Sequence, residues 1–242
     1  IGQWAISNRC TIPEISLDNP GVWMKDGRHL LLGCESDPVT YGLGEVSPEG
    51  ERERIALLSG ANSGGKTTLL ETLASMILLS HSGLPVPACN AKIGLLDELH
   101  ILAKVSGTQS AGALERTLNK LAEVLVSSER KIILADELEA ITEPGAASLI
   151  LGGLLKSSKS NPDTNILLVT HIGNSISEVM GRDIRIDGIE AQGLDENMDL
   201  IVDRNPKRNH LARSTPELIV RRLASRSKGP TSEIFTSLLQ GF

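Results

Sequence analysis

The chain has 242 residues, and 40% of them are apolar, which is enough to bury a core and excludes a disordered chain. Thirty acidic residues against 24 lysines and arginines give a net charge of −6, which excludes a protein that acts mainly as a basic coat on nucleic acid. An aromatic content of 2% argues against a channel that stacks single-stranded bases.

The sequence carries no targeting or membrane signal. Its longest nearly apolar runs, around Ile77–Leu79 and Leu149–Leu155, are far shorter than the roughly 20 residues of a membrane span, and there is no secretory start. The three cysteines form no C-x-x-C pair. We therefore expect a cytoplasmic protein without membrane contact. Because the chain starts at Ile1 rather than Met, we also expect it to be part of a longer protein.

Apolar runs and turn signals predict the secondary structure in chain order. Turns break residues 1–34 into short strands and loops, ending in a predicted strand at His29–Gly33, and the glycines and prolines of residues 35–53 predict a loop. Beyond this point, buried-strand runs alternate with helical stripes. The predicted strands are Arg54–Ser59, Ala91–Leu95, Lys131–Ala135 and Asn165–Thr170, and the predicted helices are Lys66–Ser80, Ser110–Ser127, Ala146–Lys156 and Thr215–Ser225.

Two apolar runs near the end of the chain, Ile184–Ile189 and Met198–Asp203, predict an edge hairpin or meander. Strands that alternate with helices predict an α/β fold. We expect a mostly parallel sheet with antiparallel edge strands in residues 1–205, followed by a small helical segment in residues 206–242 that we expect to serve in dimerisation.

The strongest motif begins at Gly60, where G-A-N-S-G-G-K-T-T fits G-x-x-x-x-G-K-[ST] and lies between an apolar strand and a helix. The glycines of such a loop let backbone N–H groups turn towards phosphate oxygens, and the helix N-terminus adds positive charge. Lys66 is expected to bridge the β- and γ-phosphates of ATP, and Thr67 to place its hydroxyl on Mg²⁺. The expected nucleotide-binding residues are Gly60, Ala61, Asn62, Ser63, Gly64, Gly65, Lys66, Thr67 and Thr68.

An acidic pair ends the apolar run K-I-I-L-A. Asp136 is expected to bind Mg²⁺, directly or through water, and Glu137 to polarise the water that attacks the γ-phosphate. The run N-I-L-L-V-T is followed by His171, which is expected to sense the γ-phosphate or to orient the attacking water. Lys66, Glu137 and His171 are the predicted catalytic residues, and Thr67 and Asp136 are the predicted metal ligands.

These segments, in this order, resemble the ATPase domain of the MutS family, within the wider group of ABC-type ATPases. The loop is similar to the family's G-P-N-M-G-G-K-S-T and shares its asparagine, Asn62, and its glycine doublet. The other matching segments are Gly27-Arg28-His29, Val86-Pro87-Ala88 with Asp97, and Thr170-His171. The resemblance covers about residues 27–225, so it implies a P-loop NTPase fold of the ABC and MutS type for most of the chain.

The sequence departs from the mismatch-repair members of that family after the acidic pair. Those members carry G-R-G-T, whereas this chain has Leu138-Glu139-Ala140-Ile141-Thr142 and keeps only the threonine. The following T-E-P-G-A-A is closer to the T-D-P-x-E-G-A-A of the second MutS branch, which lacks the mismatch-recognition domain. The resemblance therefore favours that branch, or an archaeal variant of it.

The resemblance also implies a composite site, in which two ATPase domains face each other and the signature of one caps the ATP bound by the other. Ser110 is the expected contact in trans, because a hydroxyl at a helix N-terminus suits a γ-phosphate. Ser106 in S-G-T-Q, which resembles the S-G-G-Q of ABC transporters, is the alternative. Either serine implies a homodimer that joins through its nucleotide sites.

Charge is unevenly divided along the chain. Residues 204–228 contain eight lysines and arginines and one acid, a net charge of +7, so the remainder carries −13. The basic stretch either contacts DNA phosphates, forms a solvated helix face or matches the acidic body of a partner subunit. Since MutS-like proteins contact DNA mainly through other domains, we expect the main DNA contacts outside this chain.

We therefore expect the ATPase domain of a MutS-like DNA repair or recombination protein, which binds ATP and Mg²⁺ and hydrolyses ATP to ADP and phosphate to drive a DNA-bound clamp. Two alternatives stay open. One is another ABC-type ATPase, such as a transporter motor or a chromosome-maintenance protein. The other is a nucleotide-gated dimerisation module with little turnover.

Overall fold

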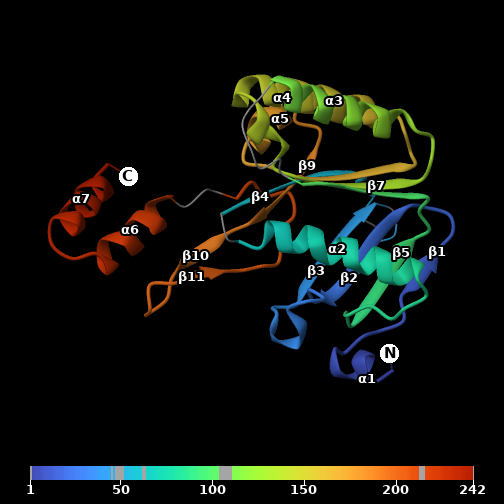
Figure 1. The fold of residues 1–242 in the computed structure, drawn as a ribbon, viewed down its shortest axis with the longest axis horizontal. Helices are drawn as coiled ribbons and strands as arrows, with labels where there is room; N and C mark the ends of the chain where they lie inside the picture. Colours follow the sequence, from blue (N-terminus) through green and yellow to red (C-terminus); the bar gives the residue numbers. More distant parts are fainter. Residues whose placement is uncertain are drawn as a thin grey trace.

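The computed structural model of the chain describes residues 2–44, 46, 52–61, 64–103, 111–212 and 216–241. Its centre is a five-stranded sheet in the order β6–β7–β8–β4–β9, in which every neighbouring pair is parallel (Figure 1). The strands are β4 (Ile55–Gly60), β6 (Glu98–Leu102), β7 (Lys131–Asp136), β8 (Thr164–Val169) and β9 (Arg185–Ile189). Every residue of β4 and β8 is buried, as central parallel strands covered on both faces require.

Each face of this sheet has its own apolar core. Ala56 and Leu58 of β4 belong to the core beneath α2, whereas Ile55 and Leu57 belong to the core on the opposite face. This alternation is the period of two that an extended strand imposes on its side chains. α2 lies on one face of the sheet, and α3, α4 and α5 cover the opposite face (Figure 1). The helices are α2 (Lys66–His81), α3 (Ala111–Val126), α4 (Pro144–Ser158) and α5 (Gly173–Val179).

A second sheet packs against the outer side of α2 and supplies antiparallel strands (Figure 1). Its order is β1–β5–β2–β3, with β2 antiparallel to both β3 and β5, and β1 parallel to β5. The strands are β1 (Glu14–Ser16), β2 (Gly21–Gly27), β3 (Val39–Gly44) and β5 (Asn90–Gly94), and the short helices α1 (Gly2–Ser7) and η1 (Gly33–Glu35) flank them.

Two predictions for the N-terminal part are wrong. The predicted strand at His29–Gly33 is absent, because the strand in this region, β2, ends at Gly27, and the predicted loop over residues 35–53 contains β3. The sequence did not predict β3 because its glycines are typical of a loop. A Cβ on Gly44 would lie 2.8 Å from the carbonyl oxygen of Pro20, so close packing of backbones, rather than a flexible loop, requires glycine there.

The predicted edge hairpin is also partly wrong. The run at Ile184–Ile189 is β9, which pairs in parallel with β4, while the hairpin consists of β10 (Ala191–Leu194) and β11 (Leu200–Val202). β6, which the sequence did not predict, forms the opposite edge of the parallel sheet and is only partly buried. An edge strand lacks the continuous apolar run that marks β4, β7 and β8.

A buried ion pair within β9 is hydrogen-bonded to β3. The Arg185 guanidinium lies 2.8 Å from Asp187 Oδ2, and the two side chains are 3% and 0% exposed. The Tyr41 hydroxyl donates a 2.9 Å hydrogen bond to the same carboxylate, and Arg185 donates one of 2.9 Å to the carbonyl of Gly42. Burial, with the charge of Asp187, raises the pKa of Tyr41 well above its ordinary value. A buried pair of this kind is costly to break on one side.

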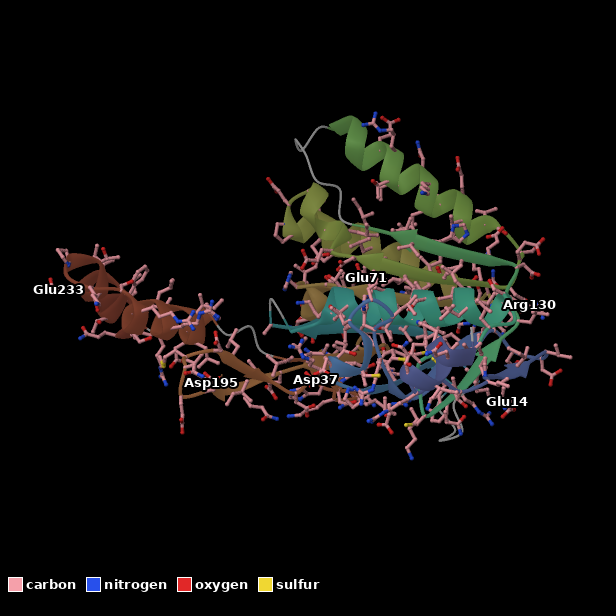
Figure 2. The ribbon with its side chains drawn as sticks, turned by 60° about the horizontal axis from the view of Figure 1, so that its bottom comes forward. Glu14, Asp37, Glu71, Arg130, Asp195 and Glu233 are labelled. Atoms are coloured by element: carbon pink, nitrogen blue, oxygen red, sulfur yellow. The ribbon has the colours of Figure 1, made fainter. Side chains whose placement is uncertain are left out.

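After β11 the chain returns to the parallel sheet. The N–H of Gly188 donates to the carbonyl of Lys207 at 3.0 Å, and the N–H of Ala212 donates to the Ser59 hydroxyl at 3.1 Å. The last helices, α6 (Pro216–Arg226) and α7 (Pro230–Leu239), pack on each other and extend away from the sheets (Figures 1 and 2). Neither helix contains a buried residue. In the described ranges no helix is long and apolar enough to cross a bilayer.

Candidate nucleotide site

The loop between β4 and α2 has two positions that only glycine suits. Gly60 has a φ of 144° and lies against β9, where a Cβ would be 2.3 Å from the carbonyl oxygen of Ile189. Gly65 has a φ of 95° and is the N-cap of α2, with no side chain bonded to the helix end. Among the described residues no side chain caps the first-turn N–H groups of α2, and the helix dipole favours an anion there. Asn62 and Ser63 lie outside the described residues.

Lys66 begins α2 and is buried, with only 5% of its surface exposed. Its ammonium group donates hydrogen bonds to the carbonyl oxygens of Gly60 at 2.9 Å and Ala61 at 3.0 Å, so the side chain folds back over the loop. Burial lowers the pKa of Lys66, and the nearby carboxylates of Glu137, Asp136 and Glu139 oppose this shift. A cationic donor therefore lies inside the loop and faces a group of acids.

Thr67 and Asp136 meet although their strands are not neighbours in the sheet. β8 lies between β4, which leads into the loop, and β7, which ends at Asp136. The Thr67 hydroxyl nevertheless donates a hydrogen bond of 2.8 Å to Asp136 Oδ2. The other carboxylate oxygen, Oδ1, is buried and has no hydrogen-bond partner in the part of the chain that the structure describes. The sequence prediction that these two side chains share a site is consistent with this geometry.

The oxygen atoms of Thr67 and Asp136 suit a magnesium ion, which prefers hard oxygen ligands. Among the described residues, no group of three or more His, Cys, Asp or Glu side chains could hold a metal. Mg²⁺ commonly binds through one or two carboxylates together with water and substrate phosphates, so the site fits this cation only in combination with a nucleotide.

Glu137 and His171 are in direct contact at the carboxyl ends of β7 and β8. Glu137 Oε1 lies 2.7 Å from His171 Nε2, and the two side chains are 20% and 38% exposed. Glu137 has a left-handed backbone with a φ of 46°, and its N–H donates to the carbonyl of Val169 at 3.0 Å. A positive φ is uncommon for glutamate, and such strained residues cluster at functional sites.

A third carboxylate completes this group, and sequence reasoning did not assign it a role. Glu139 lies in the short helix η2 (Leu138–Ile141), and its Oε1 accepts hydrogen bonds from the Thr170 hydroxyl at 2.9 Å and from the backbone N–H of His171 at 2.7 Å. The available signal was its position: aligned on Thr142, a glutamate stands where the MutS pattern G-R-G-T has its first glycine.

Two cavities adjoin the loop. One, of about 310 Å³, lies beside α2, and its lining residues include His29, Asp37, Val39, Gly65, Thr68 and Arg204. In its wall, Arg204 Nε donates to Asp37 Oδ2 at 2.6 Å, and the lining residue His29 has its Nε2 3.2 Å from Oε2 of Glu71, which lies outside the lining; Figure 2 labels Asp37 and Glu71. The other cavity, of about 360 Å³, opens beside Gly60 and His171.

The structure thus brings most of the predicted residues together. Lys66, Thr67, Asp136, Glu137 and His171 gather at the carboxyl ends of β4, β7 and β8, which is the edge where open α/β sheets bind ligands. Gly64 donates its N–H to Ala61 at 3.0 Å within the loop, and Thr68 lines the cavity of about 310 Å³. The two candidate signature serines, Ser106 and Ser110, lie outside the described residues.

A parallel sheet in which the interior strand β4 runs through a glycine-rich loop into the helix α2 is typical of the P-loop NTPase fold. The chain is 42% identical over 236 residues to the DNA-binding protein MutS2 of Pyrococcus furiosus, which covers 95% of this chain and 41% of that protein. It is 30% identical over 206 residues to the Endonuclease MutS2 of Fusobacterium nucleatum, and this match covers 82% of this chain and 25% of that protein. It is also 30% identical over 142 residues to the DNA mismatch repair protein MutS of Flavobacterium johnsoniae, and this match covers 56% of this chain and 16% of that protein.

The chain therefore belongs to the MutS family, as its sequence motifs indicated. No protein-family model matches the chain. The chain spans less than half of the length of each of these relatives. The similarity to MutS2 proteins is longer than that to MutS, in agreement with the expected second branch.

Proposed function

We propose that this chain is the ATP-hydrolysing domain of a MutS-like DNA repair or recombination protein. The observation that carries the proposal is the convergence of Lys66, the Thr67–Asp136 pair and the Glu137–His171 pair beside a helix N-terminus whose N-cap is a glycine. Two of the relatives are a DNA-binding protein and a DNA mismatch repair protein by name, which supports a role on DNA. The main DNA contacts would lie outside this chain.

Binding of ATP would begin with groups that are hydrogen-bonded to one another in the structure. The Lys66 ammonium donates to two neutral carbonyl oxygens, and phosphate oxygens would replace them because charge-assisted hydrogen bonds are roughly twice as strong. The first-turn N–H groups of α2 would then surround the β-phosphate. Thr67 and Asp136 would hold Mg²⁺, which neutralises charge on the β- and γ-phosphates.

Hydrolysis needs a group that takes a proton from the attacking water, and Glu137 is the proposed base. The water forms a bond to the γ-phosphorus while the bond to the β-phosphate oxygen breaks, and ADP and phosphate leave. The contact with His171 fixes the direction of the Glu137 carboxylate, and the half-exposed imidazole can also meet the γ-phosphate. This arrangement supports positioning and charge stabilisation as the main sources of catalysis.

The cavity of about 310 Å³ beside α2 is the proposed site for the base and ribose of the nucleotide. It adjoins Gly65 and Thr68, so it lies next to the phosphate loop. Its walls offer an imidazole at His29 and the Arg204–Asp37 ion pair. An imidazole can stack on or hydrogen-bond to an adenine, and the ion pair can meet ribose hydroxyls.

A homodimer is the proposed working form, with Ser110 of one subunit on the ATP of the other. Exposed apolar side chains on the last two helices support an additional contact between subunits: Ile219, Leu223, Ile234 and Leu238. Two helices that bury no residue within their own chain are expected to bury apolar surface elsewhere.

Turnover in two variants tests the proposed ATPase. Glu137→Gln keeps the shape of the side chain but removes the base, so kcat is expected to fall by about 10²- to 10⁴-fold while ATP affinity by calorimetry stays near that of the unmodified chain. Lys66→Ala removes a charged donor worth roughly 1.5–3 kcal/mol, so ATP affinity is expected to fall by about 10- to 100-fold.

The matched control is Glu143→Gln, which changes an exposed acid six residues beyond Glu137 and is expected to leave both quantities unchanged. Full turnover in Glu137→Gln would contradict the proposal that Glu137 is the base. Unchanged ATP affinity in Lys66→Ala would contradict the proposal that the loop before α2 binds phosphate. An unmodified chain that binds ATP but releases no phosphate would instead be a nucleotide-gated dimerisation module.

A further inference from the structure

Glu139 connects two segments that are far apart in the sequence. It lies two residues after Glu137, and its Oε1 accepts one hydrogen bond from the Thr170 hydroxyl and one from the His171 backbone N–H, at 2.9 and 2.7 Å. The Thr170 hydroxyl in turn accepts a hydrogen bond from the N–H of Ile172 at 3.1 Å. One carboxylate oxygen therefore fixes the backbone where β8 turns into α5.

The same two segments also meet through their functional side chains, because Glu137 Oε1 lies 2.7 Å from His171 Nε2. The segment after β7 thus holds His171 at two points: Glu137 contacts the ring, and Glu139 contacts the backbone. With the backbone N–H fixed, the imidazole can reach Glu137 from only a narrow range of positions. Without the hydrogen bonds to Glu139, the turn before α5 would be held by fewer bonds and the His171 ring would be less well oriented.

The charge of Glu139 indicates that it does more than fill space. Its second oxygen, Oε2, is buried and has no hydrogen-bond partner among the described residues, which is costly for a carboxylate. The residue is one of three acids, with Asp136 and Glu137, whose charges act on Lys66. Acids gathered with an unpaired buried oxygen are more typical of a functional site than of a packing contact.

We propose that Glu139 is a positioning residue of the nucleotide site, which holds the backbone of His171 so that its imidazole stays against Glu137. Its effect on turnover rests on the proposed ATPase function, whereas its effect on the His171 ring does not. Because Glu139 stands where the MutS pattern has glycine, this second attachment of His171 is a property of the present sequence rather than of the pattern.

Two substitutions separate the hydrogen bonds from the bulk of the side chain. Glu139→Gln keeps an oxygen that can accept both hydrogen bonds, whereas Glu139→Ala removes it. The expected kcat is within about threefold of the unmodified chain for Glu139→Gln and reduced by about 10- to 100-fold for Glu139→Ala, with ATP affinity within about threefold in both. Thr170→Val, which removes one of the two donors, should give an intermediate loss and replaces Glu139→Ala if that variant does not fold.

The position of the His171 ring is measured independently of turnover, by the ¹⁵N resonances of its imidazole. These should move in Glu139→Ala and Thr170→Val and stay in place in Glu139→Gln and in the control Glu143→Gln. Unmoved ring signals in Glu139→Ala, or equal losses of kcat in Glu139→Ala and Glu139→Gln, would overturn the proposal. An unmodified chain without any turnover would contradict the ATPase function, while the ring signals would still decide the role of Glu139.

Discussion

The parallel sheet and the two C-terminal helices differ in how far their apolar side chains are buried. Strands β4 and β8 bury every residue, whereas α6 and α7 bury none and leave Ile234 and Leu238 more than half exposed. The sheet is held by apolar cores on both faces and by the buried Arg185–Asp187 pair. The helices are held by each other and by charged contacts with the β10–β11 hairpin, so we expect them to contribute little to the stability of the sheet.

The largest expected effect is on the buried ion pair. Asp187→Ala leaves the Arg185 charge and the Tyr41 hydroxyl without their buried partner, and should lower the free energy of unfolding by about 3–5 kcal/mol, measured by urea denaturation. The control is Asp183→Ala, which removes an exposed acid paired with Lys159 and should cost at most about 1 kcal/mol. Equal losses in the two variants would show that the buried pair does not hold β9 to β3.

A pair of identical substitutions compares the two regions directly. Leu134→Ala in β7 removes a side chain that is 0% exposed and should cost about 2–5 kcal/mol. Leu223→Ala in α6 changes a side chain that is 40% exposed and should cost less than about 1 kcal/mol in the monomer. A large loss for Leu223→Ala that depends on protein concentration would point to burial of α6 between subunits, which sedimentation would detect.

The smallest expected effect is at the contact between α6 and the hairpin. Asp199 lies 3.0 Å from Arg226 and 3.9 Å from Arg222, and all three side chains are well exposed. Asp199→Asn should therefore change the free energy of unfolding by no more than about 1 kcal/mol, and the difference should shrink in high salt. A larger loss that persists in high salt would mean that α6 is part of the cooperative fold of the sheet.

Sequence patterns predicted the central elements better than the edges. β4, β7 and β8 are continuous apolar runs, and α2 follows a glycine-rich loop, so their positions could be read directly. β3 was missed because its glycines resemble a loop, and β6 because an edge strand is only half buried. The parallel pairing of β9 with β4 was missed because pairing partners leave no mark in a short apolar run.

The candidate site shows the same division. Motif spacing predicted Lys66, Thr67, Asp136, Glu137 and His171 as one site, and the structure brings their side chains together, while their roles stay predictions. Glu139 could not be assigned in this way, because its partners Thr170 and His171 lie more than thirty residues further along the chain.

By itself, the sequence determined the membership of the MutS family and the α/β class, and it predicted the residues of a candidate nucleotide site, because these depend on local patterns of glycine, charge and apolar runs. The tertiary structure alone decided that β8 separates β4 from β7, that Glu139 holds the backbone of His171, and that α6 and α7 stand away from both cores. These features depend on which distant segments pack together, and packing is a property of the whole fold rather than of any local pattern.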